Sequence, residues 1–258
     1  MSRMPVIFFG HGSPTNALDD NEFTRAWTKL GANLKQKPKG ILCISAHWCT
    51  RGTAVTAMKN PKTIHDFGFF GKALNSLQYP APGSPELAQR VADILAPIKV
   101  GLDQSWGLDH GTWSVLVHAF PKADIPVVQL SMDVGLSTHE RFAVGQKLAA
   151  LRDEGILIVG TGNIVHNLGV MDWDPKSEPY PWAQQFHDYI CSAITKNQPE
   201  DVLKAENQGR IAHMSHPSPD HFWPIMYILG TRLDGDKTTL YTPKVLHKSL
   251  SMMSLLIG

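Results

Sequence analysis

The sequence of 258 residues has few cysteines, almost no net charge and no long apolar run, and each shortage excludes a class of protein. Its three cysteines, Cys43, Cys49 and Cys191, include no CxxC pair, so neither a disulfide framework nor a thiolate zinc site is indicated. Lys and Arg number 24 against 23 Asp and Glu, which leaves no basic stripe for nucleic acid and no polybasic tail for a membrane surface. We therefore expect a neutral globular protein in a reducing compartment.

Two further absences concern location and domain organisation. No apolar run approaches the roughly 18 to 20 residues that a membrane span needs, and residues 1–5 are too short for a signal peptide. The cytoplasm is therefore the expected compartment. No internal repeat, low-complexity tract or break in composition marks a boundary, so we expect residues 1–258 to form a single domain, with the possibility of a homo-oligomer left open.

Histidine is the one residue type in excess, with 12 copies. It is the commonest metal ligand in proteins and the usual proton carrier near neutral pH. Three of the histidines each follow an apolar run that predicts a buried strand. They are His11 after residues 6–9, His47 after residues 41–45 and His166 after residues 156–159. If these strands are parallel neighbours, their carboxyl ends meet at the edge where α/β sheets bind ligands, and the three imidazoles face one cavity.

The rest of the chain alternates helix and strand signals, which predicts an α/β fold with a central, mostly parallel or mixed sheet flanked by helices. Strands are also expected at 52–58 and 125–130, and Pro126 places the second at a sheet edge or at a strand start. Helices are expected where apolar residues recur at helical spacing or follow capping residues. These helices are residues 23–34, a helix from Ser84 and Pro85, a helix after the capping box at 137–140, and a helix from Pro181.

Residues 60–85 are rich in proline, glycine and aromatic residues and predict a long irregular connection. Inside a compact domain such a segment is more often a functional lid than a linker. His65 lies in its aromatic part, and Ser13 lies two residues after His11. We expect both side chains to contact a substrate.

The other histidines separate by their surroundings. His110 lies between two tryptophans and two glycines, which suits a pocket wall. His216 and His221 lie close together in a Pro-rich segment, and spacing alone does not choose between them. Ser218 and Pro219 resemble a helix start that would hold His221 in place and leave His216 on the looser side. The remaining histidines are expected on solvated faces or loops. They are His118, His139, His187, His213 and His247.

A cluster of imidazoles without thiolates suits zinc, iron, copper or nickel and argues against the ions that prefer oxygen ligands. Neutral ligands leave the full charge on the metal, so bound water or a bound hydroxyl becomes acidic, and open positions remain for a substrate. Two reaction classes remain open from the residues alone. One is hydrolysis by a zinc-bound hydroxide, and the other is activation of O2 at ferrous iron with an ortho-diphenol bound through both oxygens.

Five motifs together resemble the class III extradiol ring-cleaving dioxygenases, and within them the 4,5-DOPA extradiol dioxygenase branch. They span nearly the whole chain in the family's order. The motifs are GHGSP at 10–14, SAHW at 45–48, WGLDHG at 106–111, GNIVHNL at 162–168 and PDHFWP at 219–224. The resemblance implies a single α/β domain with a metal site at the carboxyl ends of the strands, a small catechol such as L-DOPA and O2 as partners, Fe(II) for activity and Zn(II) in the purified protein.

Carried over residue by residue, the resemblance implies that His11, His47 and His221 bind the metal. His166 would be the base that takes a catechol proton, or a fourth ligand without substrate, and His110 would hydrogen-bond the bound oxygen or the catechol. Much of the superfamily has a glutamate as its third ligand, whereas this chain has His221 at the matching place. Asp220 is adjacent, but neighbouring side chains rarely reach the same point.

Two alternatives use the same histidines. A zinc-dependent hydrolase would cleave an amide or ester and be indifferent to oxygen. A non-catalytic relative would bind a metal or a partner with the same fold. The sequence leaves open the physiological catechol, the ring bond that is cut, and iron against zinc in the cell.

Overall fold

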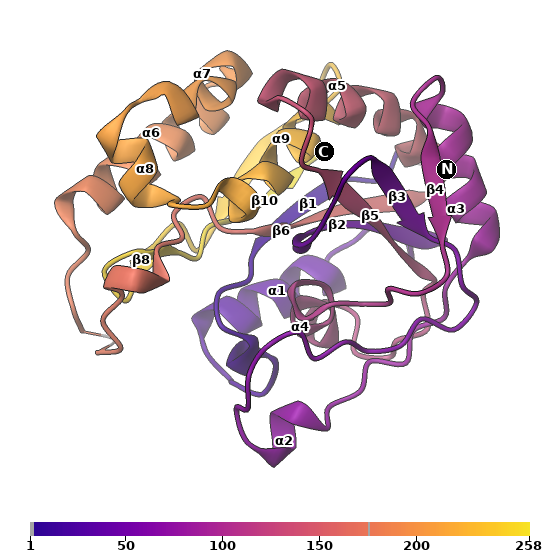
Figure 1. Ribbon diagram of the computed structural model, residues 1–258, viewed down its shortest axis with the longest axis horizontal. Coiled ribbons are helices and arrows are strands. Elements are labelled where there is room, and N and C mark those ends of the chain that lie inside the picture. The colour runs from indigo at the N-terminus through magenta and orange to yellow at the C-terminus, as the bar shows by residue number, and fades with distance from the viewer. Residues whose placement is uncertain (1–2, 175) are drawn as a thin grey trace.

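The computed structural model describes residues 3–174 and 176–258; residues 1 and 2, at the start of the segment considered for a signal peptide, lie outside the described residues. The strands of the main sheet are β1 Val6–Gly10, β2 Gly40–Thr50, β3 Thr53–Thr56, β4 Val100–Asp103, β5 Val127–Asp133, β6 Ile156–Gly162, β7 Thr238–Tyr241 and β10 Ser254–Ile257. Within the described ranges these eight strands lie in the order β4-β3-β5-β2-β6-β1-β10-β7 (Figure 1). A small ribbon pairs β8 Val245–Leu246 with β9 Leu250–Ser251.

The centre of the sheet is parallel. Strands β5, β2, β6 and β1 run parallel to one another, whereas β3 pairs antiparallel with β5 and β10 pairs antiparallel with β1. Phe9 of β1 and Ser45 of β2 both pair with Thr161 of β6, so the three strands reach the same level at their carboxyl ends. The predicted parallel arrangement of the strands that precede the three histidines is confirmed, as is the α/β fold with a mixed sheet.

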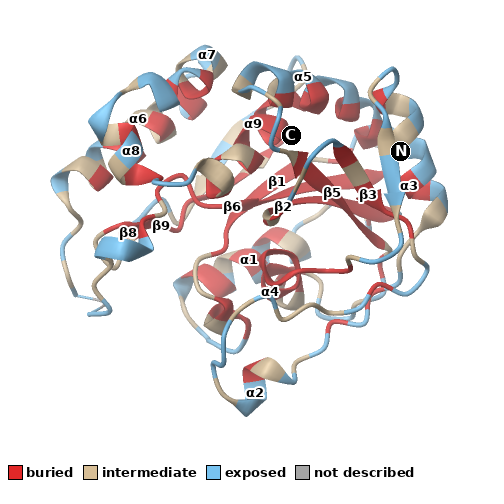
Figure 2. Ribbon diagram, in the orientation of Figure 1, coloured by how far each residue is buried: buried red, intermediate tan, exposed pale blue. Residues whose placement is uncertain are grey.

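Helices cover both faces of the sheet (Figure 1). The helices in the described part of the chain are α1 Glu22–Ala32, α2 Lys72–Asn75, α3 Pro85–Leu95, α4 His110–Ala119, α5 Thr138–Leu148, α6 Pro181–Thr195, α7 Pro199–Leu203, α8 Arg210–Ser215 and α9 Trp223–Gly230. Successive strand residues point to opposite faces, so Phe8 packs in the cluster with α3, α5, α6 and α9, and Phe9 packs in the cluster with α1 and α4. The central strands are therefore buried on both sides (Figure 2), which explains their continuous apolar runs.

Several helices begin where capping chemistry predicts. Ser84 accepts a hydrogen bond at the start of α3, and Pro85 is its first residue. Ser137 and Glu140 form a reciprocal capping box at α5, and Pro181 opens α6. Each cap satisfies amide groups that a helix start leaves unpaired, so the local sequence determines these boundaries.

Three local expectations differ from the structure. Helix α1 ends at Ala32, so Leu34 lies beyond it, and the strand expected at 52–58 is limited to β3. Pro126 precedes β5, which lies inside the sheet between β3 and β2, so it marks a strand start and the edge interpretation is wrong. Because Pro126 lies before the strand, its missing N–H removes no hydrogen bond from the sheet. Its carbonyl accepts a hydrogen bond from Ile41 N at 2.8 Å.

Strand β2 is longer than its apolar run. It continues through His47 to Thr50, and its pairing with β5 shifts register between Ile44 and Cys49. Such an irregularity bends a strand and redirects its side chains. His47 is therefore presented by a bulged strand rather than by a turn after the strand.

Residues 60–85 are mostly irregular, as predicted, and contain only the short helix α2 before α3 begins. The segment follows the side of the molecule that carries α1 and α4 (Figure 1). No helix in the described part of the chain is both long and apolar enough to cross a membrane.

Candidate metal centre

Three imidazoles from distant parts of the chain meet at the carboxyl edge of the central strands. His11 lies one residue beyond β1, His47 lies in β2, and His221 ends the 3₁₀ turn Pro219–His221. Their ring centroids are 5.0 Å apart for His11 and His47, 5.3 Å for His11 and His221, and 4.9 Å for His47 and His221. One ligand atom of each lies within 4.8 Å of the other two, so the three rings can share a cation.

The electrostatics of the three rings suit a metal ion. Burial, assisted by the neighbouring imidazoles, lowers the pKa of His11, His47 and His221, so these rings are neutral near pH 7 and keep a lone pair for a cation. His11 is 1% exposed, and its buried Nδ1 has no hydrogen-bond partner among the described residues. Its Nε2 lies 3.0 Å from Nε2 of His47. An all-nitrogen donor set of this kind fits iron or zinc better than magnesium or calcium.

Two carboxylates lie behind the imidazoles. Asp220 Oδ2 is 2.6 Å from His221 Nδ1, and Asp66 Oδ2 is 3.7 Å from His47 Nδ1. A carboxylate at the outer nitrogen of a ligating imidazole fixes its tautomer and raises its basicity. Asp220 thus supports His221 and is not one of the three ligand atoms that gather at the centre.

His166 lies directly against His221. The two rings are stacked, with centroids 3.6 Å apart and an interplanar angle of 2°. Backbone hydrogen bonds hold this arrangement, because His166 N donates to Ser215 O at 2.7 Å and Asn163 N donates to His221 O at 2.9 Å. Burial lowers the pKa of His166 to about 4, so the ring is neutral near pH 7 and can accept a proton.

His110 is positioned by the start of α4. Asp109 caps this helix and is fully buried; its Oδ1 accepts hydrogen bonds from Ser45 Oγ at 2.7 Å and Thr112 N at 3.1 Å. Gln129 Nε2 donates to Asp109 Oδ2 at 2.7 Å. These hydrogen bonds hold both carboxylate oxygens of Asp109 and so fix the start of α4. His110 is the first residue of this helix, and its ring centroid lies 3.9 Å from that of His47.

A cavity of about 530 Å³ opens beside the five histidines. All five of the rings described above contribute to its lining, and the rest of the wall is mainly apolar and aromatic. The wall includes Phe67, Phe70, Met171, Trp173, Leu246 and Met252. This volume and lining suit a small aromatic molecule whose polar end meets the imidazoles.

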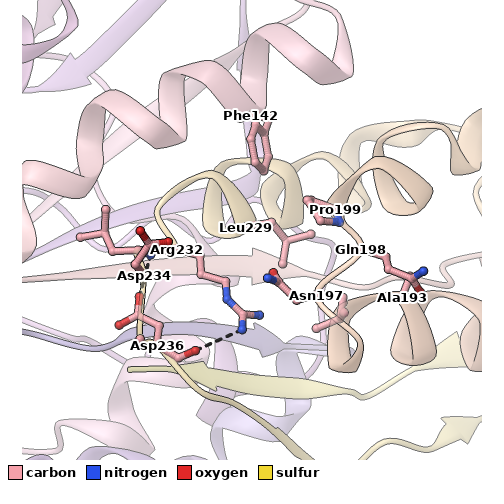
Figure 3. Close-up of a pocket in the computed structure, with 12 residues that line it drawn as sticks. Phe142, Ala193, Asn197, Gln198, Pro199, Leu229, Arg232, Asp234 and Asp236 are labelled. Carbon is pink, nitrogen blue, oxygen red and sulfur yellow. Dashed lines mark hydrogen bonds between the residues drawn. The ribbon is translucent and has the colours of Figure 1, made fainter.

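A second cavity, of about 210 Å³, lies where α5, the α6–α7 connection and the turn after α9 meet (Figure 3). Its most polar side chain, Arg232, donates to Asp236 O at 3.1 Å and to Thr238 Oγ1 at 2.9 Å. No histidine or cysteine is among the described residues that line it. The histidine-lined cavity is therefore the candidate site.

The structure brings together His11, His47, His110, His166 and His221, as the sequence predicts. Ser13 lines the same cavity, and its Oγ accepts a hydrogen bond from Thr15 Oγ1 at 2.9 Å. His65 is not among the described lining residues; its Nε2 lies 2.9 Å from Leu77 O, and its ring contacts Phe67, which does line the cavity.

Other histidines also differ from simple expectation. His216 lies outside the cluster, as expected. However, it is buried and stacks on Phe222, so the expectation that it is loosely held is wrong. Pro219 does open a helical turn, although the turn is a single 3₁₀ turn and the Ser218 side chain makes no cap. His187 is buried, contrary to the expectation of a solvated ring, and His247 lines the cavity mouth beside Trp173.

Sequence reasoning missed the two supporting carboxylates. Asp66 was overlooked in favour of its neighbour His65, although successive residues of an extended chain point in opposite directions. The signal available was a carboxylate inside an otherwise aromatic segment. Asp220 was considered only as a rival ligand, and its adjacency to His221 is what allows it to contact the outer nitrogen.

Comparisons with known proteins show similarity over nearly the whole chain. The family model described as the catalytic LigB subunit of aromatic ring-opening dioxygenase matches residues 4–257. A protein of Escherichia coli (strain K12) named 4,5-DOPA dioxygenase extradiol is 49% identical, over 100% of this chain and 96% of its own length. A protein of the same name from Beta vulgaris is 39% identical, over 91% of this chain and 89% of its own length.

A solved structure is similar as well. The crystal structure of an uncharacterized protein from Escherichia coli K12 matches with a TM-score of 0.85 and 45% identity, covering 99% of this chain and 100% of that chain. Agreement in sequence and in fold thus extends over nearly the whole chain. The protein described here therefore belongs to the family of the catalytic LigB subunit of aromatic ring-opening dioxygenases.

Proposed function

We propose that this protein is an extradiol dioxygenase that opens the ring of a catechol such as L-DOPA with O2, as a single catalytic domain. The observation that carries the proposal is the meeting of two buried imidazoles and one partly buried imidazole with two further histidines at one end of an apolar, aromatic cavity. Membership of the ring-opening family supports the reaction class. The names of the relatives at 49% and 39% identity support L-DOPA as the first substrate to test and cleavage at the 4,5 bond.

In this proposal His11, His47 and His221 hold the metal, with His166 as a fourth ligand when no substrate is bound. Fe(II) is the ion for activity, and Zn(II) is expected in protein as purified because neutral imidazoles suit both ions. A bound ferrous ion would supply the Lewis acidity and the electron transfer that O2 chemistry requires.

His166 acts as the base. It lines the cavity beside His221, and burial keeps its ring neutral, so it can take a proton from a catechol hydroxyl. Deprotonation makes the ring richer in electrons and thus more reactive towards oxygen. The same imidazole can return the proton when the oxygen–oxygen bond breaks.

His110 and the cavity wall orient the reactants. His110 meets the cavity next to His47 and can hydrogen-bond an oxygen atom there. Ser13 contacts the substrate directly, while His65 acts on it through the ring of Phe67. The apolar wall excludes water from the aromatic ring and stacks against it.

The test is reconstitution of the protein with Fe(II) under anaerobic conditions, followed by L-DOPA and air. We expect a yellow product, uptake of O2 and incorporation of both atoms of ¹⁸O2 into the product. His166→Ala should lower turnover by roughly 100-fold or more, the range for loss of a general base, while metal analysis shows that most of the iron is retained.

The proposal fails if iron-loaded protein leaves every catechol intact once air is admitted. Turnover of a chromogenic ester or amide by the zinc form, without any need for oxygen, would instead identify a hydrolase. Metal binding without turnover of either substrate class would identify a non-catalytic relative.

A further inference from the structure

One carboxylate, that of Asp66, contacts two imidazoles of the candidate site. Its Oδ1 lies 3.0 Å from His110 Nδ1 and also accepts a hydrogen bond from His110 N at 2.9 Å. Its Oδ2 lies 3.7 Å from His47 Nδ1. The Asp66 side chain is 17% exposed, although the residue as a whole is exposed.

The contact with His110 Nδ1 is not aligned as a hydrogen bond and the contact with His47 is longer than one, so Asp66 acts on both rings through its charge, which favours the ring proton on the nearer nitrogen. A ring nitrogen that faces a carboxylate is the protonated one, and the opposite nitrogen keeps its lone pair. For His47, the opposite nitrogen is Nε2, which lies 3.0 Å from Nε2 of His11 at the centre of the cluster. For His110, Nε2 is left as the nitrogen that is free to meet a ligand in the cavity.

We propose that Asp66 is a positioning residue that sets the tautomer and the orientation of both His47 and His110. The inference rests on the proposed function in assigning His47 to the metal and His110 to the reacting oxygen. A single carboxylate then keeps a metal ligand and an oxygen-contacting side chain in fixed relation, although they come from β2 and α4.

The position of Asp66 in the chain adds a consequence. It lies in the irregular segment 60–85, next to Phe67, and both Phe67 and Phe70 line the cavity. Trp113 Nε1 donates to Ile64 O at 2.8 Å and so ties this segment to α4. The same segment therefore supplies both the carboxylate that contacts the two imidazoles and part of the aromatic wall.

A different role for Asp66 has to be separated from this one. His47, Asp66 and His110 also offer ligand atoms within 4.8 Å of one another, so the three could hold a second ion. In that case His47 would bind through Nδ1 and Nε2 at once, which requires loss of its ring proton. Asp66 as a positioning residue needs no such loss, and it predicts one metal ion per chain.

The experiment uses zinc-loaded protein with ¹⁵N-labelled histidine. Two-bond ¹H–¹⁵N NMR spectra report the tautomer of each ring, and competition with a chelator reports the Kd for Zn²⁺. In Asp66→Ala we expect the Nδ1–H tautomer of His110 to be lost or mixed, and the Kd to rise about 10- to 100-fold. Zinc bound through Nε2 keeps the proton of His47 on Nδ1, so the zinc affinity is the readout for that ring. Asp66→Glu should recover part of both effects. Glu200→Gln is the control, since its carboxylate contacts His139 at the surface, 3.4 Å away.

The inference is overturned if Asp66→Ala keeps the wild-type tautomers and zinc affinity, or if wild-type protein binds two zinc ions and Asp66→Ala binds one. Asp66→Asn is the second variant, in case the alanine variant does not fold. It keeps the size of the side chain but removes its charge, and an unchanged zinc affinity there would also overturn the inference. Neither readout involves catechol or O2, so failure of the proposed function would leave this result interpretable.

Discussion

At the scale of single residues, charge at the cavity mouth bears on the choice of catechol. Asp19 is the one carboxylate among the described residues that line the cavity, and no lysine or arginine is among them. Its neighbour Asp20 is already paired with Arg25 at 2.7 Å, whereas Asp19 is exposed and lines the cavity. The mouth can therefore attract the ammonium group of a substrate side chain but offers no cation for a carboxylate.

We predict that Asp19→Asn raises the KM for catechols with an ammonium group, such as L-DOPA and dopamine, by roughly 2- to 5-fold. An exposed charge pair contributes about 0.2 to 1 kcal/mol, which sets this range. A catechol that carries only a carboxylate on its side chain should keep its KM or bind slightly better. The effect should weaken at high salt. Asp20→Asn is the matched control, and equal changes for all catechols would contradict the prediction.

At the scale of elements, the site depends on how closely α4 approaches β2. Gly111, the second residue of α4, has no side chain to separate them. A Cβ added there would lie 2.5 Å from Ser45 Oγ and 2.7 Å from His47 Cδ2. Both distances are shorter than real Cβ contacts, so the helix or the side chains of Ser45 and His47 would have to move.

Gly111→Ala should therefore destabilise the protein by about 1 to 3 kcal/mol, the range for overpacking. Because the added Cβ also meets the ring of His47, the affinity of Gly111→Ala for zinc should fall as well, by about tenfold. Urea unfolding and chelator competition measure the two effects. Gly101→Ala in β4 is the control, since its added Cβ would meet Ala54 Cβ at an ordinary 3.8 Å. Wild-type zinc affinity in Gly111→Ala would show that the contact does not position His47.

The same elements show how far sequence reasoning extends. Apolar runs followed by glycine-containing turns were enough to place His11 and His166 at the edge of a parallel sheet, because burial on both faces leaves a clear pattern. The continuation of β2 through His47 was not predicted, since a register shift depends on the partner strand rather than on local sequence. Asp66 was missed for a related reason. An irregular segment has no periodicity, so only tertiary contacts show which of its side chains faces His110.

At the scale of the whole molecule, Arg152 connects parts of the chain that are far apart in sequence. It is 1% exposed, and its guanidinium donates to Met4 O before β1, to Thr231 O after α9 and to both oxygens of Asp236. The Arg152 guanidinium thereby holds together the turn that leads to β7 and the residues that precede β1. The hydrogen bonds from Arg152 and from Leu233 N, together with the Arg152 charge, lower the pKa of Asp236 although burial acts in the opposite direction.

Asp236→Asn should leave the buried guanidinium without its counter-charge and lower the free energy of unfolding by about 3 kcal/mol, or the Tm by roughly 6 to 12 °C. Asp153→Asn, which removes an exposed partner of Arg3, should cost less than about 1 kcal/mol. A carboxylate whose pKa is lowered by folding stabilises fully above the unfolded value of about 3.9, and this stabilisation is lost as the pH falls towards the folded value. The difference between wild type and Asp236→Asn should therefore be full at pH 7 and shrink below about pH 4. Equal stability of the two Asp→Asn variants at pH 7 would mean that Arg152 is held by its carbonyl partners alone.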